Sequence, residues 1–146
     1  MFKKKIIIVL SIAVTITVLG AIYAYSEFNR KTKGTKDMDT AFSLNATSLI
    51  SEFEKDFIIS NSKYLNKVIE VEGTVKSVED QTGYTIVFGD SSSSTSIRCT
   101  MDSSFKLGFK LKAGQLCSIK GIYTGFNADD LGIGSDIIIS KSIIKP

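Results

Sequence analysis

The chain has 146 residues, of which 43% are hydrophobic and 23% charged, and it contains no histidine and no tryptophan. This size fits one globular domain with an appendage and excludes two domains that each have a core. The formal net charge of +3 is spread unevenly: residues 1–38 hold seven basic and two acidic side chains, and residues 39–146 hold eleven basic and thirteen acidic ones. The mildly acidic globular part disfavours a general nucleic-acid binder, because neutralised phosphates supply most non-specific affinity.

The N-terminal segment has the length and apolarity of a membrane span. No charged residue occurs from Ile6 to Ser26, and about twenty helical residues at 1.5 Å each cover roughly the 30 Å of hydrocarbon in a bilayer. Tyr23 and Tyr25 suit an interfacial aromatic belt. We therefore predict a transmembrane anchor over residues 1–26, in contact with the membrane through Ile6–Tyr25. The alternative is a signal peptide that ends at Ala24.

The basic residues around this segment favour one orientation. Lys3, Lys4 and Lys5 precede it, and four basic residues follow it within a short distance, so the two sides nearly balance. A short head that contains three lysines favours the cytoplasmic side. The sequence thus predicts a single-pass protein of the inner membrane whose soluble domain lies on the periplasmic, extracytoplasmic side.

A polar linker and an amphipathic helix follow. Residues 27–39 are charge-rich and predict a linker. Ser43 or Asn45 suits the start of the helix. The polar segment Ser60–Ser62 interrupts the helical pattern, and Lys63–Lys67 is expected to form a short turn that leads into the first strand. Apolar residues at helical spacing predict that this helix packs on a sheet: Phe42, Ala46, Leu49, Ile50, Phe53 and Phe57.

The remainder is rich in short strands. Ile69, Val71, Gly73 and Val75 alternate with polar residues, which is the period of a strand with one buried face. Gly73 packs poorly in a strand, so we expect it to mark a bulge or a sharp bend. The five expected strands are residues 69–76, 84–88, 95–101, 115–123 and 136–144.

The order of these elements predicts a mainly β fold. A helix is followed by five strands, and an irregular bridge over residues 102–114 separates the third strand from the fourth. This order fits a five-stranded OB-fold Greek-key barrel, here assigned to residues 40–146. In such a barrel the third strand pairs with the second and fifth, and the fourth pairs with the first and fifth. Cys99 and Cys117 would then not be ladder neighbours, so we predict free thiols.

Catalytic groups are scarce. Histidine, the commonest general acid or base, is absent. Glu70 and Glu72 share the outer face of one strand and are expected to be solvated. Asp129 and Asp130, with Asp136, could take a cation, but their spacing does not match a calcium-binding loop. We therefore predict no catalytic residue, no cofactor and no metal site, and regard a metal-dependent enzyme as the weakest alternative.

Binding is the remaining class of function. OB barrels bind ligands on the second and third strands and on the adjoining loops, which makes Tyr84, Arg98, Tyr123 and Phe126 the candidate ligand-binding residues. Their rings could stack on a base or a sugar, with Arg98 as the cation. The alternative for Tyr84 and Tyr123 is that each fills the barrel interior.

Two motifs resemble the bacterial tRNA-anti-like family of OB-fold proteins. The first is Asn61-x-Lys63-Tyr64-x-x-Lys67 followed by 68–75, VIEVEGTV, which includes Gly73. The second is Gly114-Gln115-x-x-x-Ile119-Lys120-Gly121. The resemblance covers about residues 44–144 and implies an OB fold, often with an N-terminal anchor. Its motif positions are expected to be structural: Lys63, Tyr64 and Lys67 would dock the helical turn against the first strand through a tyrosine hydroxyl bond and lysine stems.

The family name implies a nucleic-acid ligand only weakly, and here the second and third strands carry Arg98 as their only basic residue. Two functions remain open. The first is a membrane-anchored, non-catalytic OB-fold module that binds a protein or another envelope component. The second is a single-stranded nucleic-acid binder, which the charge distribution disfavours.

Overall fold

The computed structural model describes residues 2–28, 34–80, 83–90, 93–103, 111–129 and 134–145. The chain divides into two compact units, residues 1–32 and 33–146. The second unit begins before the predicted boundary at residue 40, because the short 3-10 helix η1 (Thr35–Asp37) is part of it. Thr35 is 3% exposed, and its hydroxyl donates to the carbonyl oxygen of Lys141 at 2.6 Å.

The first unit contains helix α1 (Phe2–Phe28). Its side chains from Ile12 to Phe28 are exposed. Among the residues that the structure describes, no helix combines the length and the apolarity required to cross a bilayer. A helix is therefore confirmed in this segment, but the predicted transmembrane anchor at Ile6–Tyr25 is not supported.

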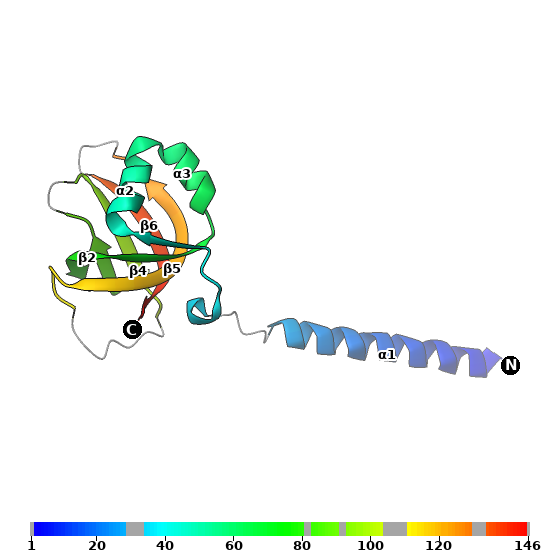
Figure 1. The fold of residues 1–146 in the computed structure, drawn as a ribbon. Helices are drawn as coiled ribbons and strands as arrows, with labels where there is room; N and C mark the ends of the chain where they lie inside the picture. Colours follow the sequence, from blue (N-terminus) through cyan, green and yellow to red (C-terminus); the bar gives the residue numbers. More distant parts are fainter. Residues whose placement is uncertain are drawn as a thin grey trace. The chain divides into compact units, whose positions relative to one another are not determined.

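The second unit is mainly β, and within its described residues five strands close into a barrel with helices packed on it (Figure 1). The strands follow the order β2-β3-β4-β6-β5, and β5 pairs back onto β2. Every pair is antiparallel except β4–β6, which is parallel. The pairings of β4 with β3 and β6, and of β5 with β2 and β6, are those predicted. Their bounds are β2 (Val68–Glu79), β3 (Thr85–Phe88), β4 (Thr95–Met101), β5 (Leu116–Asn127) and β6 (Ser135–Lys145).

Side-chain alternation explains which face of each strand is buried. In β4, Ile97 and Cys99 are fully buried in the barrel core, whereas Ser96 and Arg98 point to the outer face. Val71 of β2 and Ile119 of β5 are opposite each other and fully buried. Because the period of a strand is two, a one-residue slip would expose this whole set. The predicted irregular bridge at 102–114 falls largely outside the described residues.

The segment before the barrel differs from the single predicted helix. Phe42 lies in a short strand, β1 (Phe42–Asn45), which pairs in parallel with β2. Two helices follow, α2 (Ala46–Lys55) and α3 (Phe57–Tyr64). The predicted interruption at Ser60–Ser62 is wrong, because these residues lie within α3.

Side-chain caps explain where these two helices begin. The Asn45 side chain accepts from the Thr47 amide at 3.0 Å, which confirms Asn45 as the start of α2. Asp56 has an extended backbone between the helices, and its carboxylate accepts from the Ile59 amide at 3.0 Å. The break therefore occurs at Asp56, where a new helix is capped.

Gly73 has a different role from the predicted bulge. The β2–β5 register is continuous from Val68 to Thr74, and the register shift of β2 lies between Val75 and Ser77. A Cβ atom on Gly73 would lie 2.5 Å from the Cβ of Ala46, the first residue of α2. Glycine is needed here because the helix crosses the strand at close range.

The substitution Gly73→Ala tests this close approach. We expect it to lower the free energy of unfolding by about 1–3 kcal/mol, because the added methyl overpacks the contact with Ala46. Gly125→Ala is the matched control, since a Cβ on this β5 glycine would meet no atom within 4 Å. Urea unfolding of the two variants would contradict the interpretation if their midpoints were equal.

Candidate functional site

A polar groove lies over the outer face of β4. We call it the β4 groove; its volume is about 330 Å³. Ser96 and Arg98 project into it from β4, Lys76 from β2 and Asp136 from β6. Ser93, in the segment before β4, and Asp129, after β5, complete its principal polar lining.

The cations of the β4 groove are engaged by neighbouring groups. Arg98 forms an ion pair with Glu79 through Nη2, and its Nε lies 4.0 Å from a carboxylate oxygen of Asp136. Lys76 donates to the Ser96 hydroxyl at 3.3 Å. The guanidinium is thus shared between two carboxylates, and it does not act as an unopposed positive charge.

Partial burial alters the ionisation of Asp136, one of the acids that line the groove. It raises the pKa of Asp136; Arg98 opposes this rise, Glu79 adds to it, and Lys76 opposes it weakly. A carboxylate that is partly desolvated and next to a cation is a common feature of binding surfaces. Here it adds negative charge to a groove whose two cations already have partners.

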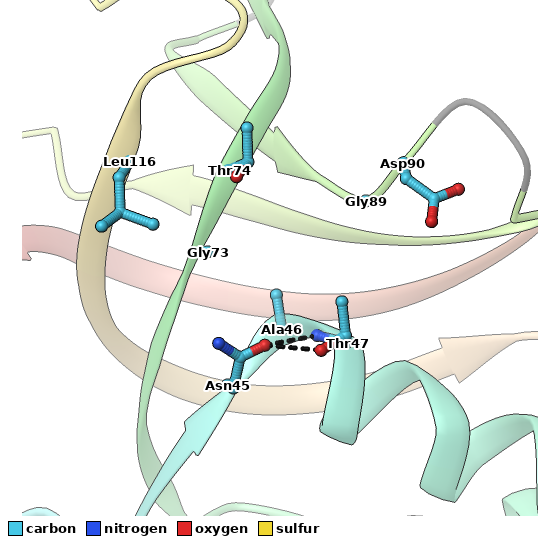
Figure 2. Close-up of a pocket in the computed structure, with 8 residues that line it drawn as sticks. All are labelled: Asn45, Ala46, Thr47, Gly73, Thr74, Gly89, Asp90 and Leu116. Carbon is cyan, nitrogen blue, oxygen red and sulfur yellow. Dashed lines mark hydrogen bonds between the residues drawn. The ribbon is translucent and has the colours of Figure 1, made fainter.

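Two further hollows continue from the β4 groove toward α2. The nearer one, of about 380 Å³, shares Ser93 with the groove and is bordered by Glu54. The farther one, of about 260 Å³, lies at the start of α2 and is lined by Asn45, Thr47 and Asp90 (Figure 2). The Asn45 carbonyl oxygen accepts from both the amide and the hydroxyl of Thr47, so these polar groups serve the helix cap.

Only one of the four predicted ligand-binding residues lies in the β4 groove, and that residue is Arg98. Tyr123 is fully buried, and its hydroxyl donates to Asn61 Oδ1 at 2.7 Å. Burial raises the pKa of Tyr123 to about 12. The prediction that Tyr123 contacts a ligand is therefore wrong, because its ring fills the space between the barrel and α3.

Tyr84 and Phe126 also pack against the core. Phe126 has its ring 5.6 Å from Phe57 and 5.2 Å from Phe53, measured between centroids. Tyr84 is partly buried against the core and its backbone carbonyl accepts from Met101. Neither ring lines the β4 groove, so neither provides the predicted stacking platform there.

The residues missed by sequence reasoning are polar and come from several elements. Ser96 was detectable as an outward position of its strand. Lys76, Asp129 and Asp136 could not be grouped with it, because only the barrel pairing brings β2, β4 and β6 together. Asp130, the partner of Asp129 in the predicted cation site, lies outside the described residues.

The family-motif residues join the helices to the barrel. Tyr64 is fully buried, and its hydroxyl donates to Glu52 Oε2 at 2.8 Å. Lys63 donates to the same oxygen at 2.9 Å. The tyrosine hydroxyl bond therefore connects α3 to α2. The prediction that this bond docks the turn against the first strand is wrong. Lys67 contributes its carbonyl oxygen, which accepts from the Tyr123 amide at 3.0 Å.

Gly121, the last motif position, allows close packing of β5 on β6. A Cβ atom there would lie 2.4 Å from Ile139 Cγ2 and 2.6 Å from Ser142 Oγ. The register of β5 with β6 shifts between Lys120 and Ile122, on either side of this glycine. The structural role expected for this position is thus evident in the barrel wall.

No reactive centre is evident in the described part of the chain. Within it, no group of three or more histidine, cysteine, aspartate or glutamate side chains is arranged to hold a metal ion. Cys99 and Cys117 are both free thiols. Burial raises the pKa of Cys117 to about 11 and that of Cys99 further, so both stay protonated near neutral pH, whereas a nucleophilic cysteine must be a thiolate.

The comparison with protein families matches residues 1–133 to the tRNA_anti-like family, so the chain belongs to that family. The match begins earlier than the predicted resemblance at 44–144 and stops before β6. The search of curated proteins finds no match.

A similar solved structure comes from Klebsiella pneumoniae subsp. pneumoniae MGH 78578 and is provisionally described as a nucleic acid-binding lipoprotein. It is 13% identical to this chain, and the alignment covers 71% of this chain and 91% of that one, with a TM-score of 0.52. At this identity the likeness shows a shared fold alone.

The Glu52 carboxylate provides a test of the contact between α2 and α3. Hydrogen bonds from Lys63 and then Tyr64 hold the pKa of Glu52 below its ordinary value, although burial opposes them. A lowered folded-state pKa gives stability that is present above the ordinary carboxyl pKa, about 4.3, and is lost as the pH falls through the folded value. We therefore expect Glu52→Gln to be less stable than the wild type at pH 7 and to lose less stability between pH 7 and pH 3.

Urea unfolding at several pH values measures this effect. Glu72→Gln is the control, because Glu72 is an exposed carboxylate on β2. If Glu52→Gln and Glu72→Gln showed the same dependence on pH, the assigned role of Glu52 would be incorrect.

Proposed function

We propose that this protein is a non-catalytic binding module, built on an OB-type barrel, that associates with a membrane and holds a polar ligand in the β4 groove. The observation that carries this proposal is the groove itself, in which hydroxyl groups lie beside Arg98, already paired with carboxylates, and Lys76, already bonded to Ser96. The favoured ligand is a protein or another component of the cell envelope. Such a ligand can form hydrogen bonds with Ser96 without bringing a dense negative charge.

Electrostatics argue against a polyanion as the principal ligand. A phosphate chain is held by cations that lose counterions on binding, and affinity grows with the number of such contacts. In the β4 groove Arg98 and Lys76 face Asp129 and Asp136, and Arg98 is also paired with Glu79. Each approaching phosphate would have to compete with these carboxylates for the guanidinium.

A single-stranded nucleic acid is the second candidate. It is supported by the family to which the chain belongs and by the description of the Klebsiella protein as nucleic acid-binding. The groove also lies where OB-type barrels commonly bind oligonucleotides, over the β4 face. Against it stand the paired state of Arg98 and the absence of an aromatic ring from the described lining of the groove.

Membrane association is proposed from the composition of α1. Its exposed large apolar side chains, such as Ile16 and Leu19, are between 51% and 91% accessible. A helix that is apolar on all sides is normally covered by protein or lipid. The description of the Klebsiella protein as a lipoprotein also supports a membrane setting. The short basic head favours the extracytoplasmic side for the barrel, which protease treatment of intact cells would test.

The proposed absence of catalysis rests on the side chains present. The chain has no histidine, and burial suppresses ionisation of both thiols. The carboxylates of the β4 groove are engaged with cations or other groups. These residues suit recognition through hydrogen bonds and charge pairs.

Photo-crosslinking in cells that produce the full chain tests the ligand and its site together. A photoreactive amino acid replaces Ser96 in the β4 groove, and in a control it replaces Thr124, an exposed residue of β5 outside the groove. We expect a specific adduct at Ser96 and none at Thr124. Digestion of the adduct with protease or nuclease then identifies its chemical class.

The possible results separate the two candidate functions. An adduct from Ser96 that resists nuclease supports the proposed envelope ligand. A nuclease-sensitive adduct establishes the second candidate in its place. Equal yields at Ser96 and Thr124 would show that the β4 groove is not the binding surface.

A further inference from the structure

Helix α3 exposes an apolar surface that the barrel does not use. We call it the α3 patch: Ile58 and Ile59 of the helix and Leu65 directly after it, which are 65%, 66% and 42% exposed. The side of α3 that packs on the barrel carries the buried Tyr64 and also Phe57, whose ring stacks on Phe126 of β5. Isolated exposed apolar residues are ordinary, but a cluster on one small helix indicates a surface that something covers.

The α3 patch ends close to the point where the chain enters the barrel unit. The Asn66 amide, next to Leu65, donates to the Tyr123 carbonyl on β5 at 3.0 Å. Two residues further on, the Val68 carbonyl accepts from the Ala41 amide at 2.8 Å. The end of α3 and the entry segment therefore lie on the same edge of the barrel, where Lys120 of β5 donates to the Met38 carbonyl.

Lysine side chains border this edge. Lys67 is exposed directly after α3, and Lys36 and Lys141 are exposed beside the entry segment. The ammonium nitrogen of Lys63 lies 4.7 Å from the centroid of the Tyr64 ring. Exposed Asp37, Asp39 and Asp56 lie near the same edge. Apolar side chains with lysines beside them also occur on surfaces that insert into the interface of an anionic bilayer.

We propose that the α3 patch docks on the surface of an anionic membrane and so orients the barrel with respect to the lipid. This inference rests on the proposed membrane association of the chain. For a chain held at a membrane, this edge of the barrel is the one that we expect to face the lipid surface. The neighbouring apolar patch would then meet the headgroup region, while the mildly acidic remainder of the barrel faces water.

Tryptophan fluorescence tests the docking directly, because the natural chain contains no tryptophan. Ile58→Trp and Ile59→Trp each place one fluorophore on the α3 patch. Leu116→Trp is the matched control, since Leu116 is 67% exposed on β5, beside the pocket of Figure 2, and outside the patch. The full chain is mixed with vesicles of phosphatidylglycerol and phosphatidylcholine, with or without bromine on the acyl chains, and flotation reports how much protein is bound.

We expect the emission of Ile58→Trp and Ile59→Trp to shift to shorter wavelength and to be quenched by the brominated lipid, and the emission of Leu116→Trp to remain unquenched. If the chain floats with the vesicles but all three variants stay unquenched, the docking surface is refuted and membrane association stands. If the chain does not float, membrane association fails, and the docking inference fails with it. An emission wavelength that shifts with protein concentration, without quenching by the brominated lipid, would assign the patch to self-association and also overturn the inference.

Discussion

The pairing of β2 with β5 is the interaction on which the rest of the molecule depends. Seven residue pairs from Val68–Ile122 to Thr74–Leu116 join the two strands and close the sheet on itself. Closure removes the free edges of the barrel strands, and it places Val71 and Ile119 opposite each other in a fully buried core. Helix α2 also passes close to β2, and Gly73 makes that approach possible.

Closure also determines what the outer face can offer to a ligand. It brings side chains from β2, β4 and β6 into one groove, although they are far apart in the sequence. In that groove Arg98 lies between Glu79 and Asp136, so the charges are nearly balanced at the place where a nucleic-acid binder would concentrate cations.

The strands were predictable because one face of each is buried and the side-chain period is two. The residues of β4 were predicted in full, and the order of strands followed from the positions of the loops. The break at Asp56 was not predictable from apolar spacing, since α3 begins with exposed Phe57, Ile58 and Ile59, which obscure the amphipathic pattern. The site was only partly predictable: Arg98 was found, but Tyr123 was misassigned because alternation alone does not reveal that two helices cover its ring.

The central claim is that the paired state of Arg98 prevents this face from gripping a polyanion. Fluorescence anisotropy with short single-stranded DNA and RNA, in a salt series, measures it most directly. The account predicts no binding by the wild type up to about 100 µM protein at physiological salt. It predicts that the double variant Glu79→Gln with Asp136→Asn binds at low salt. The control double variant Glu72→Gln with Asp39→Asn, which has the same net charge, should not bind. The account would be contradicted if the wild type bound with a dissociation constant below about 1 µM and lost that binding steeply as salt rose. It would be contradicted equally if the substitutions that release Arg98 did not improve the binding.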